Sequence, residues 1–263
     1  MATMTRATLA GVVLAAGLGT RLRPLTDLRP KALCPVADKP LIDHAVDRLR
    51  PYVDALAVNA HHHADQVLTH LAGTGVHISR EDTPMGSGGA IHLLADWIGR
   101  RDVLIHNADS WLEDDLSLLV DGWDGRRPRL LVTRADGVGD FGGWDFVGVS
   151  LLPNRFVHGL PAGFSGLYDQ VWGSAHAAGE IEFVEARGHV VDTGTPSDYL
   201  RANLLANGGQ SVIGRGAVVE GTISDTVVWD GCRVDAHERL RSCIRGDGGV
   251  TVSGLPPRSG RGS

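Results

Sequence analysis

The sequence contains almost no lysine. Of its 25 basic residues, only Lys31 and Lys39 are lysines, and both fall in one nine-residue stretch. The 31 acidic residues give a formal net charge of −6 at pH 7. This charge argues against a nucleic-acid partner, because such binding depends on neutralising phosphates with a basic face. Because the chain uses arginine at every other basic position, the two lysines indicate a site in this stretch that needs an ammonium group.

Cysteine and long apolar runs are also scarce. The three cysteines, Cys34, Cys232 and Cys243, lack C-x-x-C spacing, which predicts free thiols in the cytoplasm. The longest uncharged run, residues 7–20, has 14 residues and three glycines, whereas a membrane-spanning helix needs about 20 apolar residues. We therefore expect no membrane partner. The start of the chain also imitates a signal peptide, but a buried strand explains it better, because glycines and Arg21 interrupt the apolar run.

Short apolar runs alternate with helical patterns over the first two-thirds of the chain. Strands are expected over 9–15, 53–59, 75–79, 101–107 and 146–153, and helices over 40–50, 65–71 and 89–98. Such alternation predicts an α/β fold with a Rossmann-like, mainly parallel sheet and helices on both faces. Ligands of these folds bind beyond the carboxyl ends of the strands.

The pattern changes near residue 207. Ile213 and Val219 are six residues apart, and Val228, Val234 and Leu240 repeat that spacing. A six-residue period predicts a short parallel β-helix, with irregular β-hairpins as the alternative. We expect domains over 1–206 and 207–252, followed by a disordered tail over 253–263, which is rich in glycine, proline and serine.

The strongest signal lies in the loop after the first strand. Gly17 and Gly19 allow a tight turn that offers backbone N–H groups to an anion. Leu22 occupies the position of the third glycine of G-x-G-x-x-G, and the loop is not a Walker A motif either. Arg21 can bridge phosphate oxygens, while Lys31 supplies a compact charge.

This loop resembles the opening signature of the sugar-1-phosphate nucleotidyltransferases, G-x-G-T-R-L-x-P-L-T followed by P-K. The resemblance implies that a sugar-1-phosphate attacks the α-phosphorus of a nucleoside triphosphate and releases pyrophosphate. It also implies that Arg21 steadies the triphosphate, that Lys31 neutralises the transition state, and that the fold ends in a left-handed β-helix. The loop residues that would bind the nucleotide are Leu14, Ala15, Ala16, Gly17, Gly19 and Thr20.

Further elements of this family have counterparts here. Residues 81–90 resemble its base-recognition turn, which would place Pro84, Gly86 and Ser87 at the base; Ser87 could alternatively cap the helix that follows. Asn59, at the end of the second strand, also fits the nucleotide site.

The implied metal is Mg²⁺, held by Asp109 of N-A-D and Asp192 of V-D-T-G-T. In isolation, Asp109 could instead cap a helix.

The acceptor side is less complete. Gly148 resembles a sugar-contacting glycine, and Lys39 could contact the sugar phosphate or simply begin a helix. The family normally supplies another lysine from the segment before V-D-x-G-T, but no lysine follows Lys39 here. Ser165 stands near the expected position, and Arg155 or Arg187 could compensate.

Within the family, the chain most resembles short bacterial enzymes that transfer guanylyl to mannose-1-phosphate or uridylyl to N-acetylmuramate-1-phosphate. The missing lysine leaves open cytidylyl transfer to a non-sugar phosphate or phosphonate. A catalytically silent, nucleotide- or sugar-binding regulatory subunit is the third alternative. A homo-oligomer also stays open, because the β-helix often mediates assembly in this family.

Overall fold

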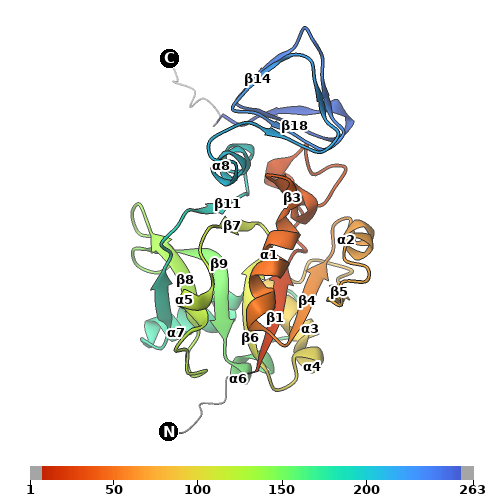
Figure 1. Cartoon of the computed structure of the whole chain (residues 1–263). Coiled ribbons are helices and arrows are strands. Elements are labelled where there is room, and N and C mark those ends of the chain that lie inside the picture. The colour runs from red at the N-terminus through yellow and green to blue at the C-terminus, as the bar shows by residue number, and fades with distance from the viewer. Residues whose placement is uncertain (1–7, 256–263) are drawn as a thin grey trace, which may run out of the picture. The chain divides into compact units, whose positions relative to one another are not determined.

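The structure is a computed structural model that describes residues 8–255 (Figure 1). Its contacts divide the chain into two compact units. The first combines the described residues up to Leu18 with Ile42–Val190, and the second combines Gly19–Leu41 with the described residues from Val191 onward. These units are defined by contacts and combine separate stretches of the chain. The predicted boundary after residue 206 divides the chain into continuous stretches, and it stays a prediction.

A seven-stranded mixed sheet forms the centre of the first unit. Its strand order is β10-β8-β9-β6-β1-β4-β5. The pairs β1–β4, β1–β6, β4–β5 and β8–β10 are parallel, and β9 runs antiparallel to both β6 and β8. The strands are β1 (Leu9–Leu14), β4 (Ala55–Ala60), β5 (His77–Arg80), β6 (Asp102–Asn107), β8 (Arg129–Arg134), β9 (Trp144–Leu152) and β10 (Glu182–Glu185). The mainly parallel α/β fold is confirmed.

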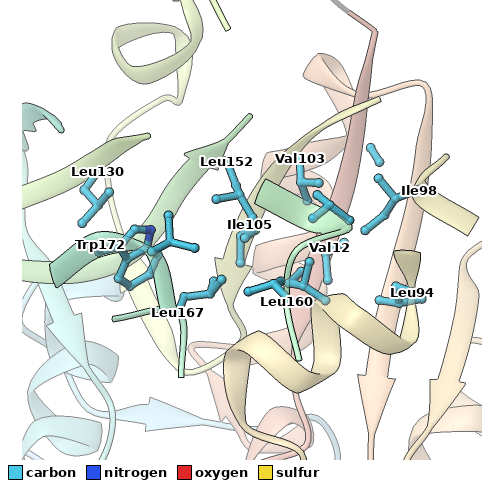
Figure 2. Close-up of a cluster of buried hydrophobic side chains, with 14 of the residues drawn as sticks. Val12, Leu94, Ile98, Val103, Ile105, Leu130, Leu152, Leu160, Leu167 and Trp172 are labelled. Atoms are coloured by element: carbon cyan, nitrogen blue, oxygen red, sulfur yellow. The ribbon is translucent and has the colours of Figure 1, made fainter. Parts of the chain in front are cut away.

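Apolar side chains are buried on both faces of this sheet. In β1, Ala10 and Val12 belong to the cluster drawn in Figure 2, together with Leu94 and Ile98 from the helical segment after β5. Val13 points to the opposite face and is equally buried. Burial of successive side chains explains why this strand reads as a continuous apolar run rather than an alternating one.

The helices of the first unit are short. They are α1 (Leu41–Leu49), α2 (Ala64–His70), α3 (Gly86–Leu93), α4 (Ala95–Ile98), α5 (Ser117–Val120), α6 (Asn154–Val157) and α7 (Gly173–Ala177), and a π-helical turn covers Tyr168–Trp172. Residues 89–98 divide into α3 and α4 at Leu94, whose φ and ψ leave the helical region. Among residues 8–255, no helix is long and apolar enough to cross a membrane.

The second unit begins with a segment that has little regular structure. Residues 19–41 contain two 3₁₀ turns, Thr20–Leu22 and Lys31–Leu33, and an antiparallel pair of strands, β2 (Pro35–Val36) and β3 (Lys39–Pro40). The longer helix α8 (Pro196–Ala206) begins at an N-cap, where the Thr195 hydroxyl accepts a hydrogen bond from the Asp198 N–H. Tyr199 of this helix is fully buried.

Short parallel strands follow α8 and stack as successive turns (Figure 1). The pairs β12–β15, β13–β16, β14–β17 and β15–β18 are all parallel, and paired residues lie 15 or 17 positions apart in the sequence. Hairpins would pair antiparallel, so the hairpin alternative is wrong. The strands are β12 (Val212–Ile213), β13 (Val218–Val219), β14 (Thr222–Ser224), β15 (Val227–Val228), β16 (Arg233–Val234), β17 (Arg239–Arg241) and β18 (Cys243–Arg245).

The last described strand, β19 (Thr251–Ser253), pairs antiparallel with β18. Ser253 was expected to open the disordered tail, and that expectation is wrong at this residue because its backbone pairs with Cys243. Residues 256–263 of the predicted tail lie outside the described residues.

Candidate active site

A buried hydrogen-bond network fixes the end of β1 in the first unit. The Ala15 N–H, just after Leu14, donates to Asn59 Oδ1 at 2.6 Å, and Asn59 Nδ2 donates to Glu81 Oε1 at 2.7 Å. Glu81 Oε2 accepts from the Met85 N–H at 3.0 Å, and both Asn59 and Glu81 are 3% exposed. The network joins two segments of the predicted nucleotide site. Sequence reasoning missed Glu81, although an acidic residue directly after a strand was a usable signal.

The predicted base-recognition turn packs against residues 163–167. The Ser165 N–H donates to the Met85 carbonyl at 3.0 Å, and the Ser165 carbonyl accepts from the Gly88 N–H at 2.8 Å. Gly86 has φ +69°, and a Cβ there would lie 2.5 Å from the Ser165 carbonyl oxygen. A glycine is therefore required at position 86 by its positive φ and by the close approach of two backbones. Pro84 is exposed at the start of the turn.

Ser87 does not cap the following helix. Helix α3 begins at Gly86, with Met85 at the N-cap position, so Ser87 lies inside the first turn. Its Oγ accepts a hydrogen bond from the Leu167 N–H at 2.9 Å. The capping alternative is wrong because the helix starts earlier than the apolar pattern indicates.

The glycine loop continues into the second unit, where it folds back on itself. Gly17 is exposed and Ala16 partly buried, while Gly19 adopts φ +63°. The Gly19 carbonyl accepts from the hydroxyl of the buried Thr26 at 2.9 Å, and a Cβ on Gly19 would lie 3.2 Å from Lys31 Cβ. Thr20 is exposed at the start of the first 3₁₀ turn. A left-handed glycine thus brings the loop next to Lys31.

Three predicted site residues converge in the second unit. Arg21 Nη2 lies 3.7 Å from Asp192 Oδ2, and Lys31 Nζ lies 3.7 Å from Asp192 Oδ1. The side chains of Arg21 and Asp192 are 67% and 63% exposed, whereas that of Lys31 is 9% exposed. The Arg21–Asp192 pair is exposed on both sides, and ion pairs of this kind add little stability. Two cations beside one accessible carboxylate are therefore candidates for binding a polyanion.

Two further predicted residues lie in the first unit beside the ends of β1 and β6. Asp109 is partly buried in the turn between β6 and β7 (Ser110–Leu112), and the preceding Ala108 N–H donates to the Leu14 carbonyl at 2.9 Å. A strand follows Asp109, so its helix-cap alternative is wrong. Gly148 has φ +87°, and a Cβ there would lie 2.1 Å from Ser110 Oγ, so packing alone requires this glycine.

The acceptor side contains no lysine beyond the one in β3. Lys39 is partly buried and lies two residues before α1, which begins at Leu41, so the alternative that Lys39 begins the helix is wrong. Ser165 is 6% exposed, and its Oγ has no hydrogen-bond partner among residues 8–255. Arg155 and Arg187 are both exposed, with the Arg155 guanidinium 4.5 Å from the Phe156 ring centroid.

Comparison with known proteins shows the family of this chain. The sequence profile of the MobA-like NTP transferase domain matches residues 11–212, which is more than half of the chain. This chain belongs to that family. It is therefore a nucleotidyltransferase, and the matched residues include the glycine loop, both predicted cations and both predicted aspartates.

Two curated relatives and one solved structure illustrate the similarity. The N-acetylmuramate alpha-1-phosphate uridylyltransferase of Caulobacter vibrioides is 37% identical over 174 residues, covering 61% of this chain and 72% of that protein. The bifunctional protein GlmU of Methanococcus maripaludis is 25% identical over 222 residues, and the match covers 73% of this chain and 53% of GlmU. HddC from Yersinia pseudotuberculosis shares the fold, with a TM-score of 0.62, 20% identity, and coverage of 75% of this chain and 99% of that one.

Proposed function

We propose that this nucleotidyltransferase joins a nucleoside triphosphate to a sugar-1-phosphate, giving an NDP-sugar and pyrophosphate. The observation that carries the proposal is that Arg21 and Lys31, which follow the two loop glycines in the sequence, both lie beside Asp192. The relatives that transfer nucleotides to sugar phosphates support the substrate class.

In this reaction, a phosphate oxygen of the acceptor forms a bond to the α-phosphorus as the bond to the β-phosphate oxygen breaks. The negative charge that develops must be neutralised without rearrangement of the site. Lys31 suits this task because its stem is buried and its ammonium is a compact charge. Arg21, being exposed and planar, suits the outer phosphates, which it can hold by two parallel hydrogen bonds.

Magnesium is the metal that we propose for this enzyme. Residues 8–255 contain no cluster of three His, Cys, Asp or Glu side chains that could enclose a metal. Mg²⁺ commonly takes only one or two carboxylates and completes its shell with water and substrate phosphates. Asp109 and Asp192 are the candidate carboxylates that the family resemblance implies, and a bound ion would supply charge neutralisation at the phosphates.

The named relative favours UTP and N-acetylmuramate-1-phosphate as the first substrates to test. A second candidate, cytidylyl transfer to a non-sugar phosphate or phosphonate, is left open by the absence of any lysine after Lys39. The three free thiols, all buried, support a cytoplasmic location.

Pyrophosphate release tests these ideas directly. The assay combines Mg²⁺, each of the five common nucleoside triphosphates, and a panel of sugar-1-phosphates, polyol phosphates and phosphonates. We expect acceptor-dependent release that falls at least about 100-fold in Lys31→Ala, because one lost charge contact at a transition state costs about that much. Asp109→Asn and Asp192→Asn should shift the Mg²⁺ dependence to higher concentration. Tight nucleotide binding without turnover over the whole panel would instead favour the silent subunit.

A further inference from the structure

The loop that carries Lys31 depends on other segments for its shape. Residues 19–41 contain two 3₁₀ turns and two strands of two residues each. A segment with so little regular structure relies on contacts with other segments to hold one conformation. Within the second unit, these contacts come from α8 and the β-helix.

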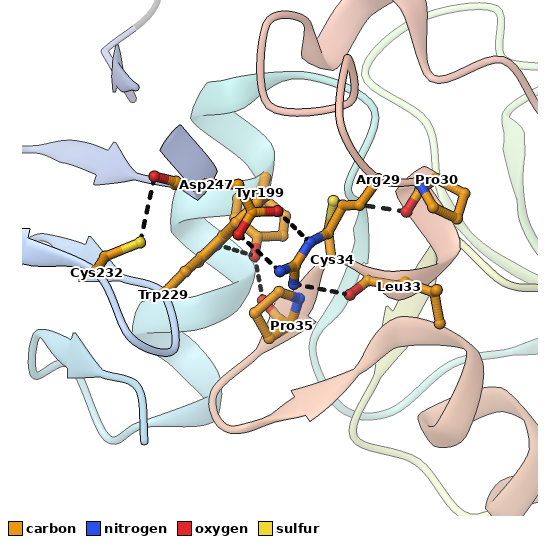
Figure 3. A network of polar contacts seen from close by, with 10 residues as sticks. Arg29, Pro30, Leu33, Cys34, Pro35, Tyr199, Trp229, Cys232 and Asp247 are labelled. Carbon is orange, nitrogen blue, oxygen red and sulfur yellow. Dashed lines mark hydrogen bonds and ion pairs between the residues drawn. The ribbon is translucent and has the colours of Figure 1, made fainter. Parts of the chain in front are cut away.

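Arg29 is the main attachment point, as Figure 3 shows. Its Nε and Nη2 donate to Asp247 Oδ2 and Oδ1 at 2.7 and 2.8 Å, a bidentate pair, and its Nη1 reaches the Leu33 carbonyl at 3.5 Å. The guanidinium carbon also lies 4.6 Å from the centre of the Trp229 ring system. Since Arg29 precedes Lys31 by two residues and Leu33 follows it by two, one guanidinium spans the turn that carries Lys31.

The same tryptophan holds the far side of the turn through α8. Trp229 Nε1 donates to the Tyr199 hydroxyl at 3.0 Å, and that hydroxyl donates to the Pro35 carbonyl. Trp229 and Tyr199 are 1% and 0% exposed. Beyond Pro35, the Ala37 N–H donates to Asn203 Oδ1 at 3.0 Å. The loop is thus attached both before and after Lys31.

A glycine of the β-helix lets its backbone approach this loop closely. A Cβ at Gly246 would lie 2.8 Å from Leu25 Cδ2 and 3.2 Å from ring carbons of Trp229. Asp247 follows immediately, so its carboxylate is presented from a backbone that is itself packed against the loop. The contact is therefore built from backbone, apolar and charged groups together.

We propose that Arg29, Trp229 and Asp247, which we name the loop clamp, position Lys31 for nucleotidyl transfer. The proposal rests on the function proposed above and adds that the β-helix supports the catalytic loop. Misplacing a reacting or charge-stabilising group by about 1 Å can lower a rate about 100-fold. Because Lys31 would act on charge that develops in the transition state, the clamp should control kcat more than KM.

Two substitutions weaken the clamp without emptying the site. Asp247→Asn removes the charge and keeps the shape, while Arg29→Lys keeps the charge and loses the planar fork. We expect each to lower kcat at least about tenfold and to change the KM of the triphosphate by less than about twofold. A raised KM with unchanged kcat would overturn the proposal.

The chain offers a matched control in Glu238→Gln. Glu238 pairs with Arg245 inside the β-helix, and their side chains are 22% and 10% exposed, against 26% for both Arg29 and Asp247. Neither member of the control pair belongs to the loop. We expect Glu238→Gln to leave kcat unchanged. An equal loss of kcat in this variant and in Asp247→Asn would reduce the clamp to general stability and overturn the proposal.

The scarcity of lysine provides a second readout, independent of activity. Lysine labelled with ¹³C at Cε gives one NMR signal each for Lys31 and Lys39, assigned with Lys39→Arg. We expect Asp247→Asn to shift or broaden the Lys31 signal and Glu238→Gln to leave it in place. If the wild-type protein transfers no nucleotide to any acceptor, the proposed function fails. The NMR comparison still decides the clamp, because an unchanged Lys31 signal in Asp247→Asn would overturn it.

Discussion

At the scale of single residues, the environment of Lys31 explains why a lysine occupies this position in an arginine-rich chain. Its side chain is 9% exposed, and its Cβ packs against Gly19. A guanidinium is planar and needs room for a fork of donors, whereas an ammonium is compact. The sequence identified the residue by its rarity, and a compact ammonium suits a side chain that is only 9% exposed.

Gly194 offers a test of Arg21 that leaves Arg21 itself intact. A Cβ at this position would lie 2.6 Å from Arg21 Nη2 and 2.9 Å from its Cζ. Because an arginine side chain is flexible and this one is exposed, Gly194→Ala should move the guanidinium at little cost in stability. We expect kcat/KM to fall about tenfold, equivalent to about 1.4 kcal/mol. Steady-state kinetics and thermal unfolding measure the two effects, and unchanged kinetics would argue against a role for Arg21.

His106 makes the stability of the first unit depend on pH. Burial lowers the pKa of this fully buried side chain in β6 from 6.5 to about 4. As the pH falls below 6.5, His106 becomes protonated in the unfolded chain but stays neutral in the folded one. Stability is therefore lost between pH 6.5 and about 4. The shift corresponds to a loss of about 3 kcal/mol over that window.

Urea unfolding between pH 7.5 and 4 checks this prediction. His106→Gln cannot take up the proton, so we expect its free energy of unfolding to fall less steeply below pH 6.5 than that of the wild type. Parallel curves for the two proteins would show that His106 does not contribute. Carboxyl groups titrate in both proteins, and comparing the two curves removes their contribution.

At the scale of elements, the start of α8 connects stability to the candidate site. Thr195 lies three residues after Asp192. Its Oγ1 accepts a hydrogen bond from the Asp198 N–H at 3.2 Å and donates one to the Asp198 carboxylate at 2.7 Å. Thr195→Ala should therefore lower the free energy of unfolding by about 1 kcal/mol. Denaturant titration measures this loss, and Thr195→Ser, which keeps the hydroxyl, should restore most of it. Equal losses in the two variants would exclude capping as the cause.

Sequence patterns predicted five of the seven strands of the central sheet, missing β8 and β10, and did not fix the boundaries of the elements. The strands expected at 9–15 and 101–107 appear as Leu9–Leu14 and Asp102–Asn107. The helix expected at 89–98 begins earlier, at Gly86, and the prediction missed residues 86–88 because they carry no apolar signal. Their backbone is shaped by residues 163–167, a distant segment that no local pattern can reveal.

At the scale of the whole molecule, the second unit is discontinuous in sequence. Residues 19–41 share a compact unit with the described residues from Val191 onward. The loop clamp uses Trp229 and Asp247, which lie beyond residue 206. Removing everything after Ala206 should therefore abolish nucleotidyl transfer and speed amide hydrogen exchange in residues 29–37. Mass spectrometry of exchange together with pyrophosphate release measures both effects. A fully active fragment of residues 1–206 would contradict this expectation.

The sequence by itself predicted the α/β fold and the glycine loop, because strand periodicity and a contiguous signature are local properties. Its short family motifs added the two cations and two aspartates as candidate site residues. Only the tertiary structure revealed Glu81 behind Asn59, the meeting of Arg21 and Lys31 at Asp192, and the attachment of Arg29 to Asp247. Arg29 and Asp247 are 218 positions apart. Their pairing depends on how the β-helix folds back on the loop, and a single sequence carries no signal of that contact.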